Sequence, residues 1–343
     1  MVEGMSLSKK NAQAILGRFP QKRILVVGDL MLDRFVYGDV TRISPEAPVP
    51  VVRVRKITAM PGGASNVAGN IRALGGAVSV AGLLGKDSAG TELRWLLKQA
   101  GVDTAAAPMS AGRMTIVKER IIAERQQVVR VDHESPAEAE GREAEKFSTL
   151  LGMELERADG VILEDYGKGT LDQKAVDAVM AAAARRGIPV GLDPKEGHDL
   201  SMKGITVATP NRREAFAIAG VADPGAQESP LRDKALLKVG EILMAKWGAE
   251  HLAITLGAQG MFLLSRGKPP RHLPTRAREV FDVSGAGDTV IAACVAALAA
   301  GAPFPDAAAL ANEAAGVVVG KLGTALCSPD ELLAHLQAGR RGA

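Results

Sequence analysis

The sequence predicts an α/β protein with a mostly parallel sheet, helices on both faces of that sheet, and a small antiparallel β lid. Short apolar runs alternate with helical patterns along most of the chain, which is typical of parallel sheets. Polar clusters follow the ends of these runs, and two other stretches alternate between apolar and charged residues. Because no linker divides the chain, we expect one domain over residues 1–343.

The apolar runs are the predicted strands of the main sheet. An amphipathic helix at 9–19 ends at Pro20, and the first strand follows at 23–28. The other predicted strands lie at 78–82, 160–164, 188–192, 205–208 and 251–256. The helical patterns between them lie at about 65–75, 88–100, 139–157, 171–186 and 232–247. Ligands of such sheets bind beyond the carboxyl ends of the strands, so we expect the site there.

Two stretches, at about 34–57 and 114–132, break this order and predict the lid. In the second stretch Val129 and Val131 alternate with Arg130 and Asp132, as in a half-exposed antiparallel strand. A lid over the ligand-binding edge would exclude water from it. Its uncovered face would be apolar, so we predict a homodimer that pairs through the lid.

The composition excludes several classes of protein. The formal charge of +3 and an aromatic content of 3% disfavour nucleic-acid binding. The two cysteines and five histidines have no zinc-ligand spacing, so we expect reduced thiols and no zinc. The longest apolar run, 290–300, is shorter than the ~20 residues that span a bilayer. We therefore expect a cytoplasmic protein with no membrane or nucleic-acid partner.

The stretch Phe281–Thr289 joins two glycines and a carboxylate to the start of an apolar helix. The backbone amides of Gly285, Ala286, Gly287 and Asp288 have no partners within that helix, so they form an anion-binding turn. Asp288 would lie beside a bound phosphate and could take a proton from an attacking hydroxyl. Alternatively, Asp288 only complements the helix dipole.

Two separated stretches carry a family resemblance. Pro61–Ala68, followed by Leu74-Gly75-Gly76, and Asp282–Thr289 resemble the two signatures of the ribokinase-like (PfkB) sugar kinases. The resemblance covers about 22–330 and implies the ribokinase-like fold. It also implies an ATP-dependent sugar kinase in which Asp288 is the general base and the amides of 285–288 stabilise the transferring phosphoryl group. A non-catalytic sugar- or nucleotide-binding regulator on the same fold is the alternative.

The resemblance assigns the sugar site to residues in the first half of the chain. Gly62, Gly63 and Asn66 match the positions that contact sugar hydroxyls, although a turn followed by a helix N-cap would use the same residues. Asp33 matches the family's sugar-binding aspartate, and Asp29 is a further candidate.

The phosphate and metal contacts are expected in the second half. Asn211 and Glu214 match the residues that hold ATP-bound Mg²⁺ through water, but the same pair is also typical of a helix capping box. Lys195 and Lys168 are candidate charges for the transferred phosphate, or ordinary solvated lysines.

Further assignments rest on the resemblance alone. Thr255 and Gly257 match residues that contact the nucleotide, and Asn312 matches the residue beside the adenine. Asp282 and Ser284 match positions that often hold a monovalent cation such as K⁺ through backbone carbonyls.

Within the family, Gly28–Arg34 and Thr41–Val52 resemble the kinase domain of bacterial heptose-phosphate enzymes of lipopolysaccharide assembly. This implies a sugar-phosphate substrate, D-glycero-β-D-manno-heptose 7-phosphate, with transfer to its anomeric hydroxyl. Many such enzymes continue into an adenylyltransferase domain with an HxGH motif. The sequence has no such motif, so we expect the single-function form.

The phosphate of that substrate would need its own basic site. The candidates are the basic side chains of the lid: Arg42, Lys118, Arg120 and Arg130. Each of them could equally be a solvated charge on an exposed strand. The alternative substrate is a neutral sugar, as in a ribokinase, fructokinase or nucleoside kinase, for which a basic lid has no use.

Overall fold

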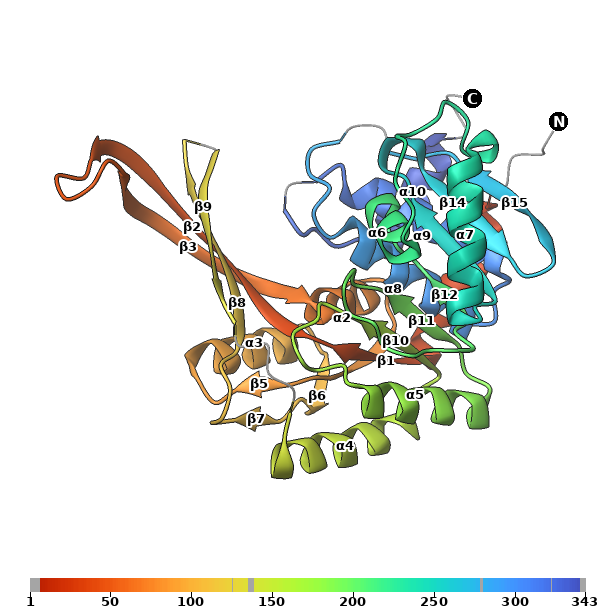
Figure 1. The fold of residues 1–343 in the computed structure, drawn as a ribbon, viewed down its shortest axis with the longest axis horizontal. Coiled ribbons are helices and arrows are strands. Elements are labelled where there is room, and N and C mark those ends of the chain that lie inside the picture. The colour runs from red at the N-terminus through yellow and green to blue at the C-terminus, as the bar shows by residue number, and fades with distance from the viewer. Residues whose placement is uncertain (1–6, 125, 135–138, 278–279, 322, 340–343) are drawn as a thin grey trace.

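The main sheet forms the centre of the molecule in the computed structural model, which describes residues 7–124, 126–134, 139–277, 280–321 and 323–339 (Figure 1). Its strand order is β15-β14-β13-β12-β11-β10-β1-β4-β6. In chain order these strands are β1 Arg23–Gly28, β4 Ala77–Ala81, β6 Asp103–Ala106, β10 Gly160–Glu164, β11 Val190–Asp193, β12 Val207–Ala208, β13 His251–Thr255, β14 Met261–Ser265 and β15 Lys268–Leu273. The strands from β6 to β13 pair in parallel, and β14 and β15 continue the sheet antiparallel.

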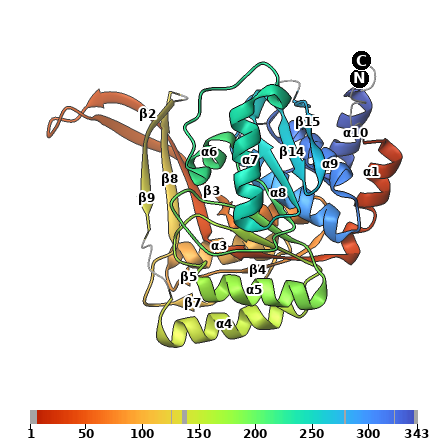
Figure 2. The same cartoon turned by 45° about the vertical axis from the view of Figure 1, so that its right-hand side comes forward.

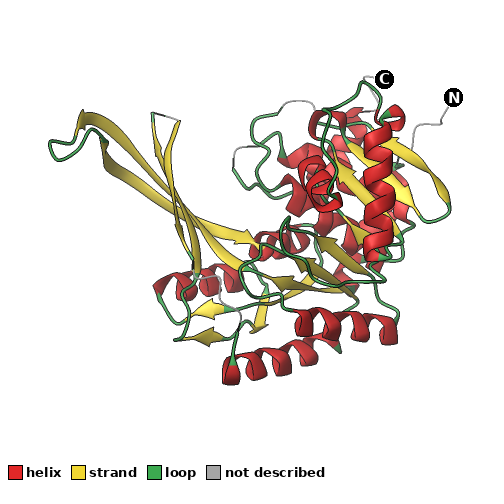
Figure 3. Cartoon of the chain, viewed as in Figure 1, coloured by secondary structure: helices red, strands yellow, loops and turns green. Residues whose placement is uncertain are grey.

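Helices cover both faces of this sheet (Figures 2 and 3). Alternate residues of β1 enter two separate cores: Ile24 and Val26 pack into one, Leu25 and Val27 into the other. The first core contains α1 Lys9–Leu16, α2 Ala64–Ala73, α3 Ser88–Gln99, α8 Ala286–Ala299, α9 Phe304–Val318 and α10 Pro329–Gly339. The second contains α4 Gly141–Leu155, α5 Gln173–Arg186, α6 Arg212–Ala219 and α7 Lys234–Trp247. The predicted α/β fold with helices on both faces is confirmed.

The lid is a second sheet that projects from the main body (Figure 1). Its strand order is β3-β2-β8-β9, with β2 Leu30–Ile43, β3 Pro50–Gly63, β8 Ile116–Ala123 and β9 Gln126–His133. The β2/β3 and β8/β9 hairpins are antiparallel, as expected, but β2 pairs with β8 in parallel. The chain passes through β4 and β6 of the main sheet between the hairpins, so β8 starts at the same end of the lid as β2.

A few short elements complete the fold. Strands β5 Leu84–Gly85 and β7 Met109–Ser110 form a small parallel pair. The 3₁₀ turns are η1 Phe19–Gln21, η2 Pro230–Arg232 and η3 Gly257–Gln259. Within the described ranges, the helices are too short or too polar to cross a membrane.

Candidate active site

The turn that the sequence predicts to bind an anion precedes α8, and a glycine makes it possible. Contrary to the expectation, the Ala286 N–H is not free, because it donates to the Val283 carbonyl over 3.2 Å. Gly285 is the N-cap of α8 and has a φ of 77°, in the left-handed region. A Cβ at this position would lie 2.9 Å from Nδ2 of Asn66, so a side chain would also displace Asn66 at the start of α2. The turn and the start of α2 therefore lie in direct contact, although they are more than 200 residues apart in sequence.

Asp288 lies in the first turn of α8 and is 9% exposed. Its Oδ2 accepts a hydrogen bond of 2.6 Å from Nδ2 of Asn66, and the next residue, Thr289, donates from Oγ1 to Oδ1 of Asn70 over 2.7 Å. Burial raises the pKa of Asp288 to about 6, although the bond from Asn66 opposes that rise. A carboxylate with a pKa near neutrality is suited to accepting a proton from a hydroxyl.

The predicted sugar residues meet at the base of the lid. Gly62 pairs with Met31 across β2 and β3, and a Cβ on Gly62 would lie 2.3 Å from Oδ2 of Asp33. Only glycine leaves room for this carboxylate. Asp33 is 6% exposed, and its Oδ1 accepts a hydrogen bond of 2.6 Å from the Arg120 guanidinium.

Asp29 has a different role from the one that the sequence suggested. Its carboxylate accepts hydrogen bonds from the backbone N–H groups of Tyr166, Lys168 and Thr170, over 3.2, 3.0 and 3.1 Å. These bonds hold the loop after β10. With its lone pairs used in this way and its side chain buried, Asp29 organises the loop rather than facing a sugar.

Three basic side chains lie on one face of the lid. We call this face the polar lid face, and its basic residues are Lys118, Arg120 and Arg130. Register pairs place Lys118 beside Asp33 and Arg120 beside Arg130. The ammonium of Lys118 lies 4.7 Å from the centre of the Tyr166 ring, and burial lowers its pKa. Arg130 binds Asp132 through two hydrogen bonds of 2.7 and 2.9 Å.

Arg42 does not join this group within one chain, contrary to the expectation. It lies near the far end of β2, nine residues beyond Asp33, which corresponds to about 30 Å along a strand. The β2/β3 hairpin extends away from the body at that end (Figure 1). The sequence resemblance around 41–52 could not reveal how far the strand continues.

Neither of the two candidate phosphate lysines lines the cavity beside the anion-binding turn. Lys168 donates to Oε1 of Glu134 over 2.7 Å. Lys195 lines a neighbouring hollow of 250 Å³ together with His198 and Lys246. Their assignment to the transferred phosphate stays a prediction.

A cavity of 640 Å³ adjoins the anion-binding turn and gathers the predicted nucleotide residues. Its lining includes Asn211, Thr255, Gly257, Ala286, Gly287 and Asn312. Apolar side chains such as Val283, Val290 and Val319 line it as well. Asn312 donates from Nδ2 to the Pro274 carbonyl over 2.8 Å, which fixes one wall. The size and mixed polarity of the cavity suit a nucleotide.

Asn211 and Glu214 form the capping box that was the alternative interpretation. Oδ1 of Asn211 accepts from the Glu214 N–H over 3.0 Å, and Oε2 of Glu214 accepts from the Asn211 N–H over 3.0 Å. The box fixes both side chains at the start of α6. It leaves the water-mediated contact with magnesium as a prediction.

The side chain of Asp282 ties the segment before α8 to a second loop. Its Oδ1 accepts from the Ser284 N–H over 2.9 Å, and its Oδ2 accepts from the Gly323 N–H over 3.1 Å. Burial raises the pKa of Asp282, but these hydrogen bonds bring it below its usual value. The monovalent-cation assignment to Asp282 and Ser284 concerns other atoms and stays a prediction.

Two carboxylates at this site had no predicted role: Glu164, which was not singled out, and Asp193, which was expected only at the ligand-binding edge of the sheet. They end the neighbouring strands β10 and β11 and are register partners. Burial raises the pKa of both well above the usual range, and neighbouring negative charges raise it further. The signal in the sequence was their place at the carboxyl ends of apolar strands, where functional residues of such sheets occur.

The comparison with protein families now decides what this arrangement belongs to. A family model described as "pfkB family carbohydrate kinase" matches residues 21–331. The chain belongs to the pfkB family of carbohydrate kinases. It is therefore a phosphotransferase that acts on a sugar hydroxyl, which confirms the predicted family and enzyme class.

Curated relatives include several proteins named "Bifunctional protein HldE". That of Pseudomonas syringae pv. tomato is 47% identical over 323 residues, which cover 93% of this chain and 65% of the relative. That of Trichlorobacter lovleyi is 41% identical over 336 residues, covering 98% of this chain and 67% of the relative. The chain thus spans about two thirds of the length of these relatives.

Solved structures share the fold at lower identity. Phosphofructokinase-2 from Escherichia coli in complex with potassium has a TM-score of 0.75 and 21% identity, over 93% of this chain and 99% of that chain. Arabidopsis thaliana ribokinase complexed with ribose and ATP has a TM-score of 0.70 and 19% identity, over 92% of this chain and 99% of that chain. The ribokinase-like form of the α/β fold is thereby confirmed.

Proposed function

We propose that this kinase transfers the γ-phosphoryl group of ATP to the anomeric hydroxyl of D-glycero-β-D-manno-heptose 7-phosphate, giving the 1,7-bisphosphate on the route to ADP-heptose and the lipopolysaccharide core. The observation that carries the proposal is the polar lid face beside Asp33. A neutral sugar has no use for cationic side chains there, whereas a sugar phosphate can use Lys118 and can compete for Arg120 and Arg130, which pair with Asp33 and Asp132. The similarity to HldE proteins over 93% of the chain supports the same substrate class.

The residues of the chain divide the work at the site. The sugar lies between Asp33 and residues 62–66, where β3 ends and α2 starts, with its reacting hydroxyl at Asp288. Asp288 accepts the proton of that hydroxyl, and Asn66 holds the carboxylate in place through the 2.6 Å bond. The amides of Gly285, Gly287 and Asp288 would face the transferring phosphoryl group, where backbone donors stabilise developing charge, whereas the Ala286 N–H donates to the Val283 carbonyl. ATP occupies the 640 Å³ cavity.

The acidic groups near the cavity fit a divalent cation on the ATP phosphates. Oxygen ligands are those that Mg²⁺ prefers, and Glu214 lies close enough to Asp193 for its charge to raise the pKa of that carboxyl, after the effect of burial. Asn211 and Glu214 would hold the ion through water. Bound Mg²⁺ supplies positive charge that neutralises the phosphates. K⁺ beside 282–284 is part of the proposal and is supported by the potassium complex of the similar phosphofructokinase-2.

Substrate preference tests the proposal directly. We expect kcat/KM with the heptose 7-phosphate to exceed that with unphosphorylated heptose, ribose, fructose or adenosine by about tenfold or more, because one charge-assisted pair to phosphate contributes at least that much. ATP consumption with none of these sugars would favour a non-catalytic regulator. Equal turnover of a neutral sugar would remove the heptose-phosphate assignment and leave the kinase chemistry intact.

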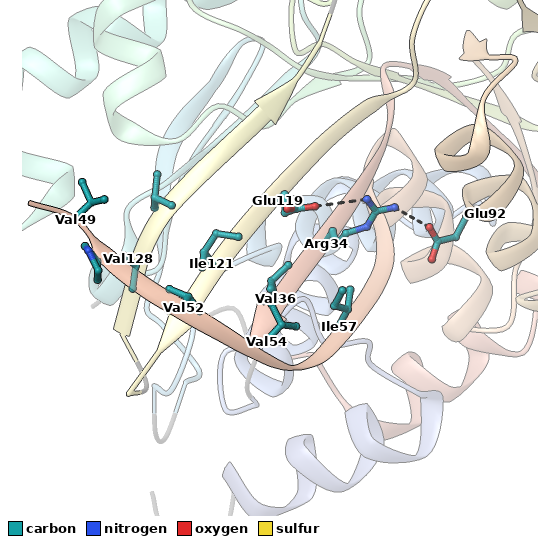
Figure 4. A pocket seen from close by; sticks show the side chains of 12 residues that line it. Arg34, Val36, Val49, Val52, Val54, Ile57, Glu92, Glu119, Ile121 and Val128 are labelled. Atoms are coloured by element: carbon teal, nitrogen blue, oxygen red, sulfur yellow. Dashed lines mark hydrogen bonds and ion pairs between the residues drawn. The ribbon is translucent and has the colours of Figure 1, made fainter. Parts of the chain in front are cut away.

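We also propose that two copies pair through the apolar lid face, the side of the lid opposite Lys118. This face borders a hollow of 910 Å³ (Figure 4). The apolar residues that line the hollow include Val36, Val52, Val54, Ile57, Ile121, Val128 and Val129. Ile57 is 58% exposed in the single chain, which is unfavourable for a large apolar side chain unless it is covered. At micromolar concentration, light scattering should give twice the chain mass for the wild type and the chain mass for Ile57→Asp. A wild-type monomer would contradict the dimer.

Three other expectations from the sequence remain proposals. These are the single domain over 1–343, the cytoplasmic location, and the lack of nucleic-acid and membrane partners. The free, buried thiols of Cys294 and Cys327 are consistent with a reducing compartment.

A further inference from the structure

Lys118 is the basic residue of the polar lid face that no carboxylate holds. Arg120 donates to Asp33 over 2.6 Å, and Arg130 binds Asp132 through two hydrogen bonds. The ammonium of Lys118 has neither a hydrogen bond nor an ion pair with the residues that the structure describes. It is therefore available for an anion that the substrate brings.

The ring of Tyr166 supplies the contact that Lys118 has instead. The ammonium lies 4.7 Å from the ring centre, within the range at which a cation is attracted to the face of an aromatic ring. A carboxylate would accept the N–H donors of the ammonium and compete with a phosphate, whereas a neutral ring competes much less. Burial lowers the pKa of Lys118, so a dianion bound beside it would also offset the cost of holding that charge there.

The backbone of the segment 166–170 fixes the place of this ring. Three of its amides, including that of Tyr166, donate to the Asp29 carboxylate, and the Gly167 N–H donates to Oδ1 of Asp165 over 2.8 Å. The φ of 64° at Gly167 lets the chain turn directly after the tyrosine. The negative charge of Asp288, together with burial, raises the pKa of Tyr166 well above its usual range. The ring is thus close enough to the general base to sense its charge, while its face contacts the lid.

We propose that Tyr166 is a positioning residue that sets the preference for a phosphorylated sugar: its ring holds the Lys118 ammonium where the phosphate group of the substrate binds. Tyr166 acts through Lys118 and does not itself bind the phosphate. The inference rests on the proposed sugar-phosphate substrate and deepens it, because it names the residue through which Lys118 becomes selective. It is independent of Arg120 and Arg130, which have their own carboxylate partners.

The ratio of kcat/KM for the heptose 7-phosphate to kcat/KM for unphosphorylated heptose tests this inference. Tyr166→Leu should lower that ratio by about 3- to 30-fold, the range that corresponds to the loss of a partly buried contact between a cation and a ring. Tyr166→Phe keeps the face of the ring and should keep the ratio. Tyr37→Leu is the matched control: it makes the same change on β2 of the lid, at a ring that stacks on Phe35 with a centroid distance of 6.4 Å, and should also keep the ratio.

A double-mutant cycle separates positioning from a general structural role. In the Lys118→Met background, Tyr166→Leu should not change the ratio further, because the ammonium that the ring holds is already absent. A tyrosine with a structural role alone would lower kcat/KM for both sugars alike, in either background. A cooperative thermal transition of each variant shows that it is folded.

Two results would overturn the inference alone. One is an unchanged ratio in Tyr166→Leu. The other is a ratio at least about threefold lower in Tyr166→Phe, which would assign the role to the hydroxyl; this variant keeps the shape of the tyrosine, so the result is measurable even if Tyr166→Leu does not fold. A wild-type ratio of about one would instead remove the sugar-phosphate assignment and the inference with it, while ATP consumption with either sugar would retain the kinase function.

Discussion

The half of the site in the main body and the half on the lid use different kinds of side chain. On the main sheet, short side chains and backbone amides are fixed by burial, as at Asp288 and in the turn at Gly285. On the lid, long charged side chains project from two strands: Lys118 is half-buried against the Tyr166 ring, and Arg130 is exposed. A short motif can therefore predict positions on the main sheet, whereas positions on the lid depend on the length and pairing of the strands.

Removing the general base should have the largest effect. We expect Asp288→Asn to lower kcat by about 10²- to 10⁴-fold, because Asn cannot accept the proton of the attacking hydroxyl. The hydrogen bond to Asn66 involves one carboxylate oxygen, so an amide can preserve the local structure. Steady-state kinetics with saturating ATP measure the effect.

The matched control is Asp282→Asn, which changes a carboxylate of the same segment that holds a loop through backbone N–H groups. It should cost less in kcat than Asp288→Asn does. A near-normal kcat for Asp288→Asn would remove the residue from its proposed role.

A side chain in the anion-binding turn should have the next largest effect. Gly285→Ala places a Cβ 2.9 Å from Nδ2 of Asn66 and forces Ala to a φ of 77°. We expect a loss of about 1–3 kcal/mol in the free energy of unfolding, together with a lower kcat, because strain and displacement act at the same point. Chemical denaturation and kinetics on the same sample measure both.

Gly152→Ala is the control for this substitution. Gly152 lies within α4, and nothing lies within 4 Å of the added Cβ. It should raise the free energy of unfolding by about 0.5–1 kcal/mol, since Ala favours a helix over Gly. If both variants behaved alike, the turn at Gly285 would not be as constrained as its geometry indicates.

The polar lid face should show a smaller effect that depends on the substrate. We expect Lys118→Met to lower kcat/KM for the heptose 7-phosphate by about tenfold, with less change for unphosphorylated heptose, because one charge-assisted contact is lost. Lys56→Met, an exposed lysine farther along the lid on β3, should leave the ratio of the two values unchanged. An equal loss for both sugars would assign Lys118 a general role in place of phosphate recognition.

The smallest effect should come from the far end of the lid. We expect Arg42→Met to change kcat/KM by less than about twofold, because the residue lies outside the site of its own chain and surface charges contribute little. Kinetics at protein concentrations above and below the dimer dissociation midpoint would check this. A tenfold loss confined to the dimer would mean that the tip reaches the site of a second copy.

The fold was predictable where a strand is buried on both faces. The runs at 23–28 and 160–164 are apolar throughout, and both form strands within a residue of the expected bounds. Strand β15 was missed, because Pro269 and Pro270 disfavour a strand in sequence. Its position at the edge of the sheet tolerates them, and pairing with β14 overrides the local preference.

Predictability within the site follows the same division. Gly285 could be inferred because a close backbone approach restricts the residue type there. Asn66 could be inferred because the family resemblance includes it. Glu164 could not, because in sequence it only ends an apolar run, and the strand order alone brings it to Asp193. Arg42 was expected beside Lys118 but lies apart from it within one chain, because a charge pattern contains no information on distance along a strand.

Asp29 connects the lid to the main sheet. Strand β1 ends at Gly28 and β2 starts at Leu30, so a 14-residue arm leaves the centre of the main sheet through this one residue. The Asp29 carboxylate accepts hydrogen bonds from three backbone amides of the segment 166–170. A rotation of β2 relative to the main sheet would change the backbone at Asp29 and therefore its hydrogen bonds to the segment 166–170. The position of the lid is in this way coupled to Tyr166, whose ring also contacts the ammonium of Lys118 on β8.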